Sequence, residues 1–303
     1  MAELRSGLVV LAQSSQHYVL DGDRLMLCRT RGRLKKYRVM TTLVATGDEV
    51  RYRPTGPDTG ELEEVLPRRT QLSRRRAGPG RLPVEQVIVA NPDQVVLILS
   101  VCEPDPNLRM LDRLLVIAEA NELPALICAN KVDLLENAEE AREHFGLYED
   151  IGYPVLYTSA ATGEGTPELK AHLRGKMSVL CGPSGAGKSS LMNLIQPDLN
   201  LATQEISDST GKGRHTTVSA QLWPLDEGGY VADTPGLREA GFYDIDPEEL
   251  AWYFVEMRPF LSGCRFSSCT HTHEPGCAVI GAVEAGAVSP ERHDSYCRLR
   301  MGE

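Results

Sequence analysis

The residues best suited to chemistry form a glycine-rich loop past the middle of the chain. It fits the pattern G-x-x-x-x-G-K-S, and its residues are Gly182, Pro183, Ser184, Gly185, Ala186, Gly187, Lys188 and Ser189, followed by Ser190. Glycines allow successive backbone N–H groups to turn inward around a phosphate, at a helix N-terminus whose dipole favours anions. Lys188 would pair with the β- and γ-phosphates, and the Ser189 hydroxyl would bind Mg²⁺. We therefore expect a nucleoside triphosphate site with Lys188 as a catalytic cation.

A second motif, Asn130-Lys131-Val132-Asp133, would select the base. The Asp133 carboxylate can accept hydrogen bonds from the ring N–H and the exocyclic amine of guanine. Adenine has an acceptor at that ring position, so a site built on this pairing rejects it strongly. Ser159-Ala160 follows in the order usual for guanine-nucleotide proteins. Together with the phosphate loop, these residues predict GTP as the ligand.

A third motif, from Asp233 to Gly236, reads D-T-P-G and follows a predicted strand. Asp233 would hold Mg²⁺ through water, and the Gly236 N–H would meet the γ-phosphate. The stretch 207–217 is rich in Gly, Ser and Thr and is typical of a switch loop that orders around a nucleotide. Thr216 or Thr217 would supply the other magnesium ligand, and the sequence does not choose between them.

A hydrolase of this kind needs a group that positions the attacking water. Leu237 stands directly after the D-T-P-G motif, where many GTPases carry Gln, and it cannot orient water. His215 is the nearest replacement, because an imidazole could accept a proton from water or orient it. The alternative is that His215 is an exposed residue of the switch loop.

The order of these motifs along the chain is unusual. The base motif comes first, then Ser159-Ala160, the phosphate loop, the two threonines, and the D-T-P-G motif. Ordinary GTPases place the base motif after the phosphate loop. The complete guanine-nucleotide set in rotated order predicts a circularly permuted GTPase.

A cluster of three cysteines and one histidine lies near the C-terminus. Cys264, Cys269, His271 and Cys277 supply soft ligands for a closed tetrahedral Zn²⁺ site of the structural type. His273 is an alternative ligand within the same stretch. Because all four positions would be filled by protein, a catalytic zinc with an open position is disfavoured.

The charge of the chain is unevenly distributed around its net value of −10. Residues 1–85 carry 16 Lys and Arg against 10 Asp and Glu, whereas the remainder carries 16 against 32. A basic N-terminal part on an acidic body indicates a surface that meets a polyanion. The N-terminus lacks a signal-peptide layout, and no apolar run approaches the roughly 18 residues of a membrane span. We expect a cytoplasmic protein.

The pattern of apolar residues divides the chain into parts. Short strands and glycine turns over residues 4–66 predict a small OB-type β-barrel, and residues 68–85 resemble a basic linker. From residue 86, strands alternate with helices, which is typical of a multi-domain α/β protein, and each GTPase motif follows the carboxyl end of a strand. We expect strands at 95–99, 125–129, 154–157, 177–181 and 230–232, and helices from 108 to 120 and from 189.

A run of basic residues lies between two predicted strands of the barrel. Small barrels of this type bind oligonucleotides through their loops. The candidate RNA-binding residues are Arg31, Arg33, Lys35 and Lys36.

The chain closely resembles the RsgA (YjeQ) family of circularly permuted GTPases, over nearly its whole length. The residues that carry this resemblance are Arg31-Gly32-Arg33, Gly47-Asp48-Glu49-Val50, Pro67-Arg68-Arg69-Thr70, Ala90-Asn91-Pro92-Asp93-Gln94, the base motif, the phosphate loop, Gly213-Arg214-His215-Thr216-Thr217, Asp233-Thr234-Pro235-Gly236-Leu237-Arg238-Glu239, the Cys/His cluster, and Arg292 with Tyr296.

The resemblance implies four parts: an OB-fold RNA-binding domain at 1–67, the linker at 68–85, the GTPase domain at 86–242, and a mostly helical zinc-containing domain at 243–303. It also implies slow GTP hydrolysis that the small ribosomal subunit stimulates, late in the maturation of that subunit. The barrel and the zinc domain would touch ribosomal RNA, and the family pattern favours His271 over His273 as the zinc ligand. We expect a monomer that binds GTP with Mg²⁺ and one structural Zn²⁺.

Two other functions compete with this hypothesis. A permuted GTPase of large-subunit assembly would carry the same rotated motifs, but the barrel and the Cys/His cluster argue against it. An RNA-binding scaffold with a vestigial nucleotide site would not require Lys188.

Overall fold

The N-terminal part is a closed five-stranded barrel. The computed structural model describes residues 3–13, 15–30, 41–77, 83–197, 220–234 and 245–302. The barrel strands are β1 (Arg5–Gln13), β2 (Gln16–Asp21), β3 (Arg24–Thr30), β4 (Glu49–Pro54) and β5 (Thr59–Val65). Their order is β1-β2-β3-β5-β4, and a further β1–β4 pairing closes the barrel. The expected OB-type barrel is therefore confirmed.

Strand β5 was not expected from the sequence, because its sequence TGELEEV is mostly polar and has no clear alternation of apolar residues. In the structure, Gly60 and Leu62 are buried and face the barrel core, so the strand has one buried face. The core includes apolar side chains that are almost completely buried: Val9, Val19, Met26, Val50, Tyr52 and Leu62.

A two-stranded hairpin of β6 (Gln71–Ala77) and β7 (Pro83–Ala90) follows the barrel. It differs from the basic linker expected over 68–85. In the register of the hairpin, Arg74 is opposite Gln86. Arg74 Nε donates to Gln86 Oε1 at 3.1 Å, and Leu72 is buried in the central core.

The central domain is a six-stranded part of the sheet, parallel except for β12. Its strands run in the order β10 (Val155–Thr158), β9 (Ala125–Asn130), β8 (Gln94–Ser100), β11 (Met177–Cys181), β13 (Tyr230–Asp233) and β12 (Gln221–Pro224). Two separate cores lie on its faces. Helices α1 (Leu108–Ala120) and α2 (Ala138–Ile151) pack on one face, and α3 (Thr166–Leu173) and α4 (Lys188–Ile195) pack on the other. This arrangement places the carboxyl ends of the parallel strands together.

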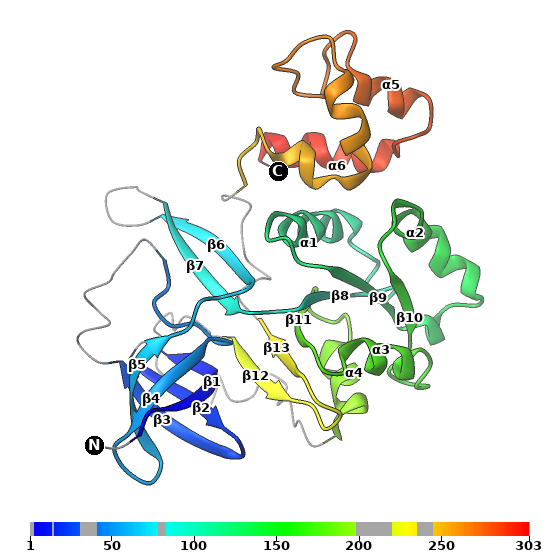
Figure 1. Cartoon of the computed structure of the whole chain (residues 1–303). Helices are drawn as coiled ribbons and strands as arrows, with labels where there is room; N and C mark the ends of the chain where they lie inside the picture. The colour runs from blue at the N-terminus through cyan, green and yellow to red at the C-terminus, as the bar shows by residue number, and fades with distance from the viewer. Residues whose placement is uncertain are drawn as a thin grey trace, which may run out of the picture.

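The barrel and the central domain share one continuous sheet (Figure 1). Strand β1 of the barrel pairs antiparallel with β12, and Leu11 lies opposite Gln221. Thus a strand near the start of the chain extends the GTPase-type sheet.

The C-terminal part is mostly helical, as expected. It contains the 3-10 segments η6 (Leu250–Tyr253) and η7 (Val255–Gly263) and the helices α5 (Ala278–Glu284) and α6 (Pro290–Met301). Its core includes Val116 of α1, so it packs against the central domain. Among the residues described, no helix is long and apolar enough to cross a membrane.

Candidate functional site

The glycine-rich loop joins the end of β11 to the start of α4, as the motif requires. Gly182 has φ 148°, and a Cβ at this position would lie 1.9 Å from the Ile98 carbonyl oxygen. Gly187 has φ 86°, and its Cβ would lie 2.3 Å from Asn130 Nδ2. Neither position accepts a side chain, because the loop passes directly over β8 and β9.

Lys188 bridges across this loop from the first residue of α4. Its Nζ donates to the carbonyl oxygens of Gly182 at 2.8 Å and Pro183 at 2.6 Å, and the residue is only 8% exposed. Ser189 follows it, half-buried, and Ser190 is exposed. A cation and two hydroxyls therefore stand at the helix N-terminus, where backbone N–H groups favour an anion.

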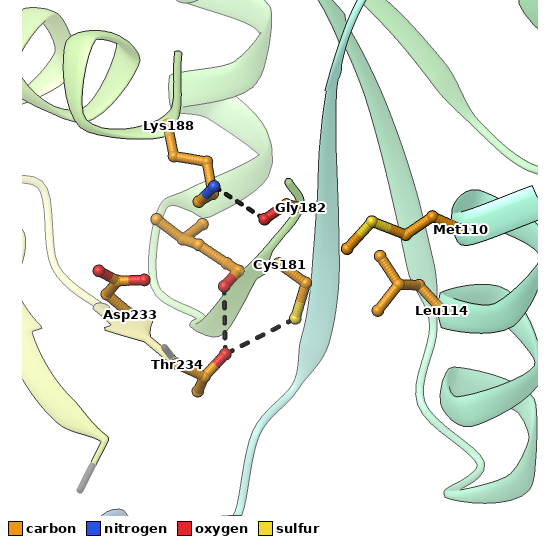
Figure 2. Close-up of a pocket in the computed structure, with 8 residues that line it drawn as sticks. Met110, Leu114, Cys181, Gly182, Lys188, Asp233 and Thr234 are labelled. Atoms are coloured by element: carbon orange, nitrogen blue, oxygen red, sulfur yellow. Dashed lines mark hydrogen bonds between the residues drawn. The ribbon is translucent and has the colours of Figure 1, made fainter. Parts of the chain in front are cut away.

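Asp233 ends β13 beside the strand that feeds the loop. Its Cα partner on β11 is Leu180, two residues before Gly182. Figure 2 shows the Asp233 carboxylate and the Lys188 ammonium around a pocket that Gly182 also lines. On the opposite side of this pocket are Met110 and Leu114 of α1. Cys181 also lines the pocket, and burial raises its pKa to about 12, so this thiol stays protonated.

The base motif lies against the phosphate loop although the chain visits it first. Asn130 ends β9 and is completely buried, and its Nδ2 donates to the Ala186 carbonyl oxygen at 2.8 Å. Its Oδ1 accepts from Thr158 Oγ1 at 3.2 Å, which fixes the orientation of the amide. A direct hydrogen bond thus joins the two motifs.

The carboxylate that would read the base is exposed at the end of this motif. Asp133 Oδ1 accepts a short hydrogen bond from Ser159 Oγ. The N–H groups of Ala161 and Thr162 donate to the same Ser159 oxygen at 3.1 Å each, so the serine holds the carboxylate and its own loop together. Ala160, which lies between Ser159 and Ala161 in the chain, is partly buried. Lys131 adopts a left-handed conformation and its Nζ donates to the Glu103 carbonyl oxygen.

Several expected site residues fall outside the part of the chain that the structure describes. They are His215, Thr216, Thr217, Gly236, Arg31, Arg33, Lys35 and Lys36.

The four expected metal ligands converge in the C-terminal part. Their ligand atoms all lie within 4.8 Å of one another. Cys264 Sγ is 3.8 Å from Cys277 Sγ, and His271 Nδ1 is 3.4 Å and 3.5 Å from these two sulfurs. A tetrahedral zinc with bonds of about 2.3 Å to sulfur and about 2.0 Å to nitrogen requires separations of about 3.8 Å and 3.5 Å. The cluster could therefore bind one zinc ion.

The alternative ligand, His273, is exposed, and its Nδ1 lies 2.8 Å from Thr272 Oγ1. It is not part of the cluster. The preference for His271 agrees with this geometry.

Two side chains of α6 hold the backbone of the ligand loop. Tyr296 Oη donates to the Thr270 carbonyl oxygen at 2.6 Å, and His293 Nε2 lies 2.7 Å from the His271 carbonyl oxygen. Glu274 accepts from the Thr270 N–H at 2.8 Å. His293 and Glu274 belong to no ligand pattern, so the sequence offered no signal for these supporting roles.

A buried ion network connects α6 to the central domain. Arg292 Nη1 donates to Asp112 Oδ1 of α1 at 2.6 Å, and Nε donates to Glu256 Oε1 at 2.6 Å. The guanidinium lies over the ring of Phe254, with Cζ 4.5 Å from its centroid. Tyr148 of α2 also donates to Asp112, at 2.7 Å, and burial raises the pKa of its phenol. The domain interface is thus fixed by specific charged contacts.

Comparisons with known proteins agree with this geometry. A family model described as RsgA GTPase matches residues 65–243. A protein of Gemmatimonas aurantiaca called "Small ribosomal subunit biogenesis GTPase RsgA" is 48% identical over 93% of this chain and 92% of its own length. A protein of the same name from Moorella thermoacetica is 45% identical over 92% of this chain and 91% of its own length.

Two solved structures share the whole architecture. The crystal structure of YjeQ from Thermotoga maritima has a TM-score of 0.79 and 37% identity, and the match covers 99% of this chain and 98% of that one. YloQ, described as a circularly permuted GTPase, has a TM-score of 0.74 and 33% identity over 99% and 94% of the two chains. The rotated order of motifs therefore corresponds to a known fold.

Proposed function

The chain belongs to the RsgA GTPase family, and on that premise we propose that it hydrolyses GTP to GDP and phosphate in late maturation of the small ribosomal subunit. The observation that carries this proposal is the hydrogen bond from Asn130 to the Ala186 carbonyl oxygen. It joins the expected guanine-selecting motif directly to the phosphate loop. The relatives' names supply the ribosomal role.

We assign the nucleotide contacts as follows. The base would bind at Asn130, Lys131, Asp133, Ser159 and Ala160, and the phosphates would bind from Gly182 to Ser190 and at Gly236. Lys188 would leave its two carbonyl partners and pair with the β- and γ-phosphates, because an anion is a stronger partner than a neutral carbonyl. Mg²⁺, held by Ser189, Asp233 and Thr216 or Thr217, would neutralise phosphate charge when bound.

For hydrolysis itself, we propose that His215 orients the attacking water. Leu237 has no group that could do so, and His215 stands beside the two candidate magnesium threonines in the sequence. The switch loop at 207–217 would respond to the nucleotide and control release from the subunit.

The barrel domain and the C-terminal domain would bind the ribosomal subunit and position the GTPase domain on it. We propose the barrel domain at 1–67 as the main RNA contact, because it carries the basic run with Arg31, Arg33, Lys35 and Lys36. The C-terminal domain at 243–303 would hold one structural Zn²⁺ at Cys264, Cys269, His271 and Cys277. The GTPase domain would span 86–242, and the whole protein would act as a monomer in the cytoplasm.

The decisive experiment is GTP hydrolysis measured with and without isolated small subunits. We expect stimulation by small subunits, and none by isolated large subunits at the same concentration. Lys188→Ala should lower the stimulated rate by about 10²–10³-fold, as expected for loss of one transition-state charge contact. Lys170→Ala, which removes a partly exposed ion pair with Glu227, is the matched control. Stimulation by large subunits alone would favour the large-subunit hypothesis.

A further inference from the structure

Thr46 ties the barrel to the central domain through a single buried hydroxyl. The residue is 2% exposed, and its Oγ1 donates to the Ala220 carbonyl oxygen at 2.8 Å. The same oxygen accepts from the Ala12 N–H of β1 at 3.2 Å. The Thr46 carbonyl oxygen accepts from the Ala90 N–H at the end of β7, at 2.8 Å. One residue therefore contacts the barrel, the hairpin and the chain that enters β12.

The turn that carries Thr46 is itself rigidly held. Asp48 is completely buried and accepts from Arg68 Nε at 2.7 Å and Nη2 at 3.0 Å. Its Oδ2 also accepts from the Ala45 N–H at 2.7 Å. A Cβ on Gly47 would lie 2.0 Å from the Ala90 carbonyl oxygen, so the turn packs tightly against β7. Because the turn is fixed, the Thr46 hydroxyl has one defined position.

Gln221, the residue after Ala220, belongs to a row of paired residues on four neighbouring strands, and the last strand of this row leads into the phosphate loop. Gln221 of β12 is opposite Leu11 of β1 on one side and opposite Asp233 of β13 on the other. Asp233 is in turn opposite Leu180 of β11, which leads to the loop. The register of this row determines where the Asp233 carboxylate stands relative to the loop.

We propose that Thr46 is a positioning residue for GTP hydrolysis. By holding Ala220, its hydroxyl fixes Gln221 and thereby keeps Asp233 in place for Mg²⁺. All four residues of β12 pair with β13, whereas Gln221 is its single paired position with β1 among the described residues. The Thr46 hydroxyl therefore adds a second tie between the barrel and the start of this short strand. The inference rests on the proposed function, because it takes Asp233 as the magnesium residue.

The test has two readouts, both recorded as a function of Mg²⁺ concentration and without ribosomal subunits. The first is intrinsic hydrolysis at saturating GTP, and the second is equilibrium binding of a fluorescent, non-hydrolysable GTP analogue, whose Mg²⁺ requirement should shift in the same direction. Thr46→Val removes the hydroxyl at nearly constant volume, whereas Thr46→Ser keeps it. We expect Thr46→Val to raise the Mg²⁺ concentration for half-maximal rate about 3- to 10-fold, the range that one lost hydrogen bond corresponds to. Thr46→Ser should match the parent.

Thr55→Val is the matched control. Thr55 is an exposed barrel residue whose hydroxyl contacts only the Thr59 hydroxyl among the hydrogen bonds of the described side chains. It should leave the Mg²⁺ requirement unchanged. If Thr46→Val does not fold, Thr46→Cys, with a weak S–H donor, takes its place with the same expectation.

The outcomes separate this inference from the proposed function. An active parent whose Mg²⁺ requirement is the same in Thr46→Val, or shifts equally in Thr46→Ser, overturns the role of Thr46 alone. An equal shift in Thr55→Val also overturns it, because the effect would then be a general one of barrel stability. A parent protein that does not hydrolyse GTP overturns both.

Discussion

The guanidinium of Arg292, on α6, donates to Oδ1 of Asp112, on α1, across 2.6 Å in the interior of the protein. The two side chains are 1% and 5% exposed, although 180 positions separate them in the chain. Glu256 supplies the second carboxylate, with 8% exposure. Two acidic groups and one cation thus form a closed network between the C-terminal and central domains.

Removing the cation should destabilise the protein strongly. Arg292→Met leaves Asp112 and Glu256 buried without a counter-charge, which costs about 3–5 kcal/mol in comparable sites. Urea unfolding followed by circular dichroism would measure the free energy of unfolding. The control is Arg298→Met on the same helix, which removes an exposed pair with Asp294 at 2.8 Å and should cost no more than about 1 kcal/mol. Similar losses in the two variants would contradict a special role for the network.

Exchanging the base-reading carboxylate should change nucleotide choice. Asp133→Asn replaces an acceptor of guanine donors with an amide, whose N–H can donate to the extra carbonyl of xanthine. We expect GTP affinity to fall about 10²-fold or more, and affinity for xanthosine triphosphate to rise. Competition against a fluorescent guanine nucleotide measures both. Asp150→Asn, at an exposed position in α2, should alter neither value; unchanged GTP preference in Asp133→Asn would refute the assignment of the base site.

Zinc content should depend on the cysteines of the cluster and not on other cysteines of the same domain. The parent protein should contain about one zinc per chain by elemental analysis, and Cys269→Ser should lose most of it, because a serine hydroxyl is a poor substitute for a thiolate. Loss of the metal should also lower the melting temperature. Cys297→Ser changes a cysteine of the same domain that lies outside the cluster, and should keep a full complement of zinc. Full metal in Cys269→Ser would exclude Cys269 as a ligand.

The barrel contains a buried histidine that should make stability depend on pH. His17 is 4% exposed, and neither ring nitrogen has a hydrogen-bond partner among the described residues. Burial lowers its pKa, against an opposing effect of the Asp48 charge. The unfolded chain, with an ordinary histidine pKa near ~6.5, therefore takes up the proton first on acidification. The stability that the protein gains by keeping His17 neutral is therefore fully present above pH ~6.5. It is lost as the pH falls from there toward the lowered pKa of the folded state.

His17→Leu isolates that contribution from the titration of the carboxylates. Its loss of unfolding free energy between pH 8 and pH 5.5 should be smaller than that of the parent, by up to about 1.4 kcal/mol per pH unit. The comparison uses chemical denaturation at both pH values. His144→Leu, which changes an exposed residue of α2, should follow the parent; equal pH dependence in the parent and His17→Leu would show that His17 is not responsible.

Local signals predicted most of the central domain. The helix expected from 108 to 120 and the strand expected from 177 to 181 match α1 and β11 at both ends, because Leu111, Leu114 and Leu115 repeat at helical spacing and β11 is continuously buried. The base motif and the phosphate loop were placed correctly at strand ends, since parallel strands deliver their carboxyl ends to one side of the sheet.

The parts of the fold that the sequence did not predict depend on contacts between residues far apart in the chain. Thr46 with Ala220, Arg68 with Asp48 and Arg292 with Asp112 are pairs of residues that lie apart in the sequence, and no local spacing links the two members of a pair. Only the folded chain brings them together. The hairpin β6–β7 stands where a basic linker was expected for the same reason, because contacts such as that of Arg74 with Gln86 form only once the two strands pair.

The pairing of β1 with β12 covers part of the outer edge of the central sheet. Strand β12 ends the central sheet, and without the barrel its outer backbone groups would lie open as an edge that could template pairing with another molecule. The barrel pairs with the start of that edge, at Gln221, from within the same chain. A truncated protein that begins after the barrel would therefore lose more than an RNA-binding module, since its central sheet would be left unsealed and prone to aggregation.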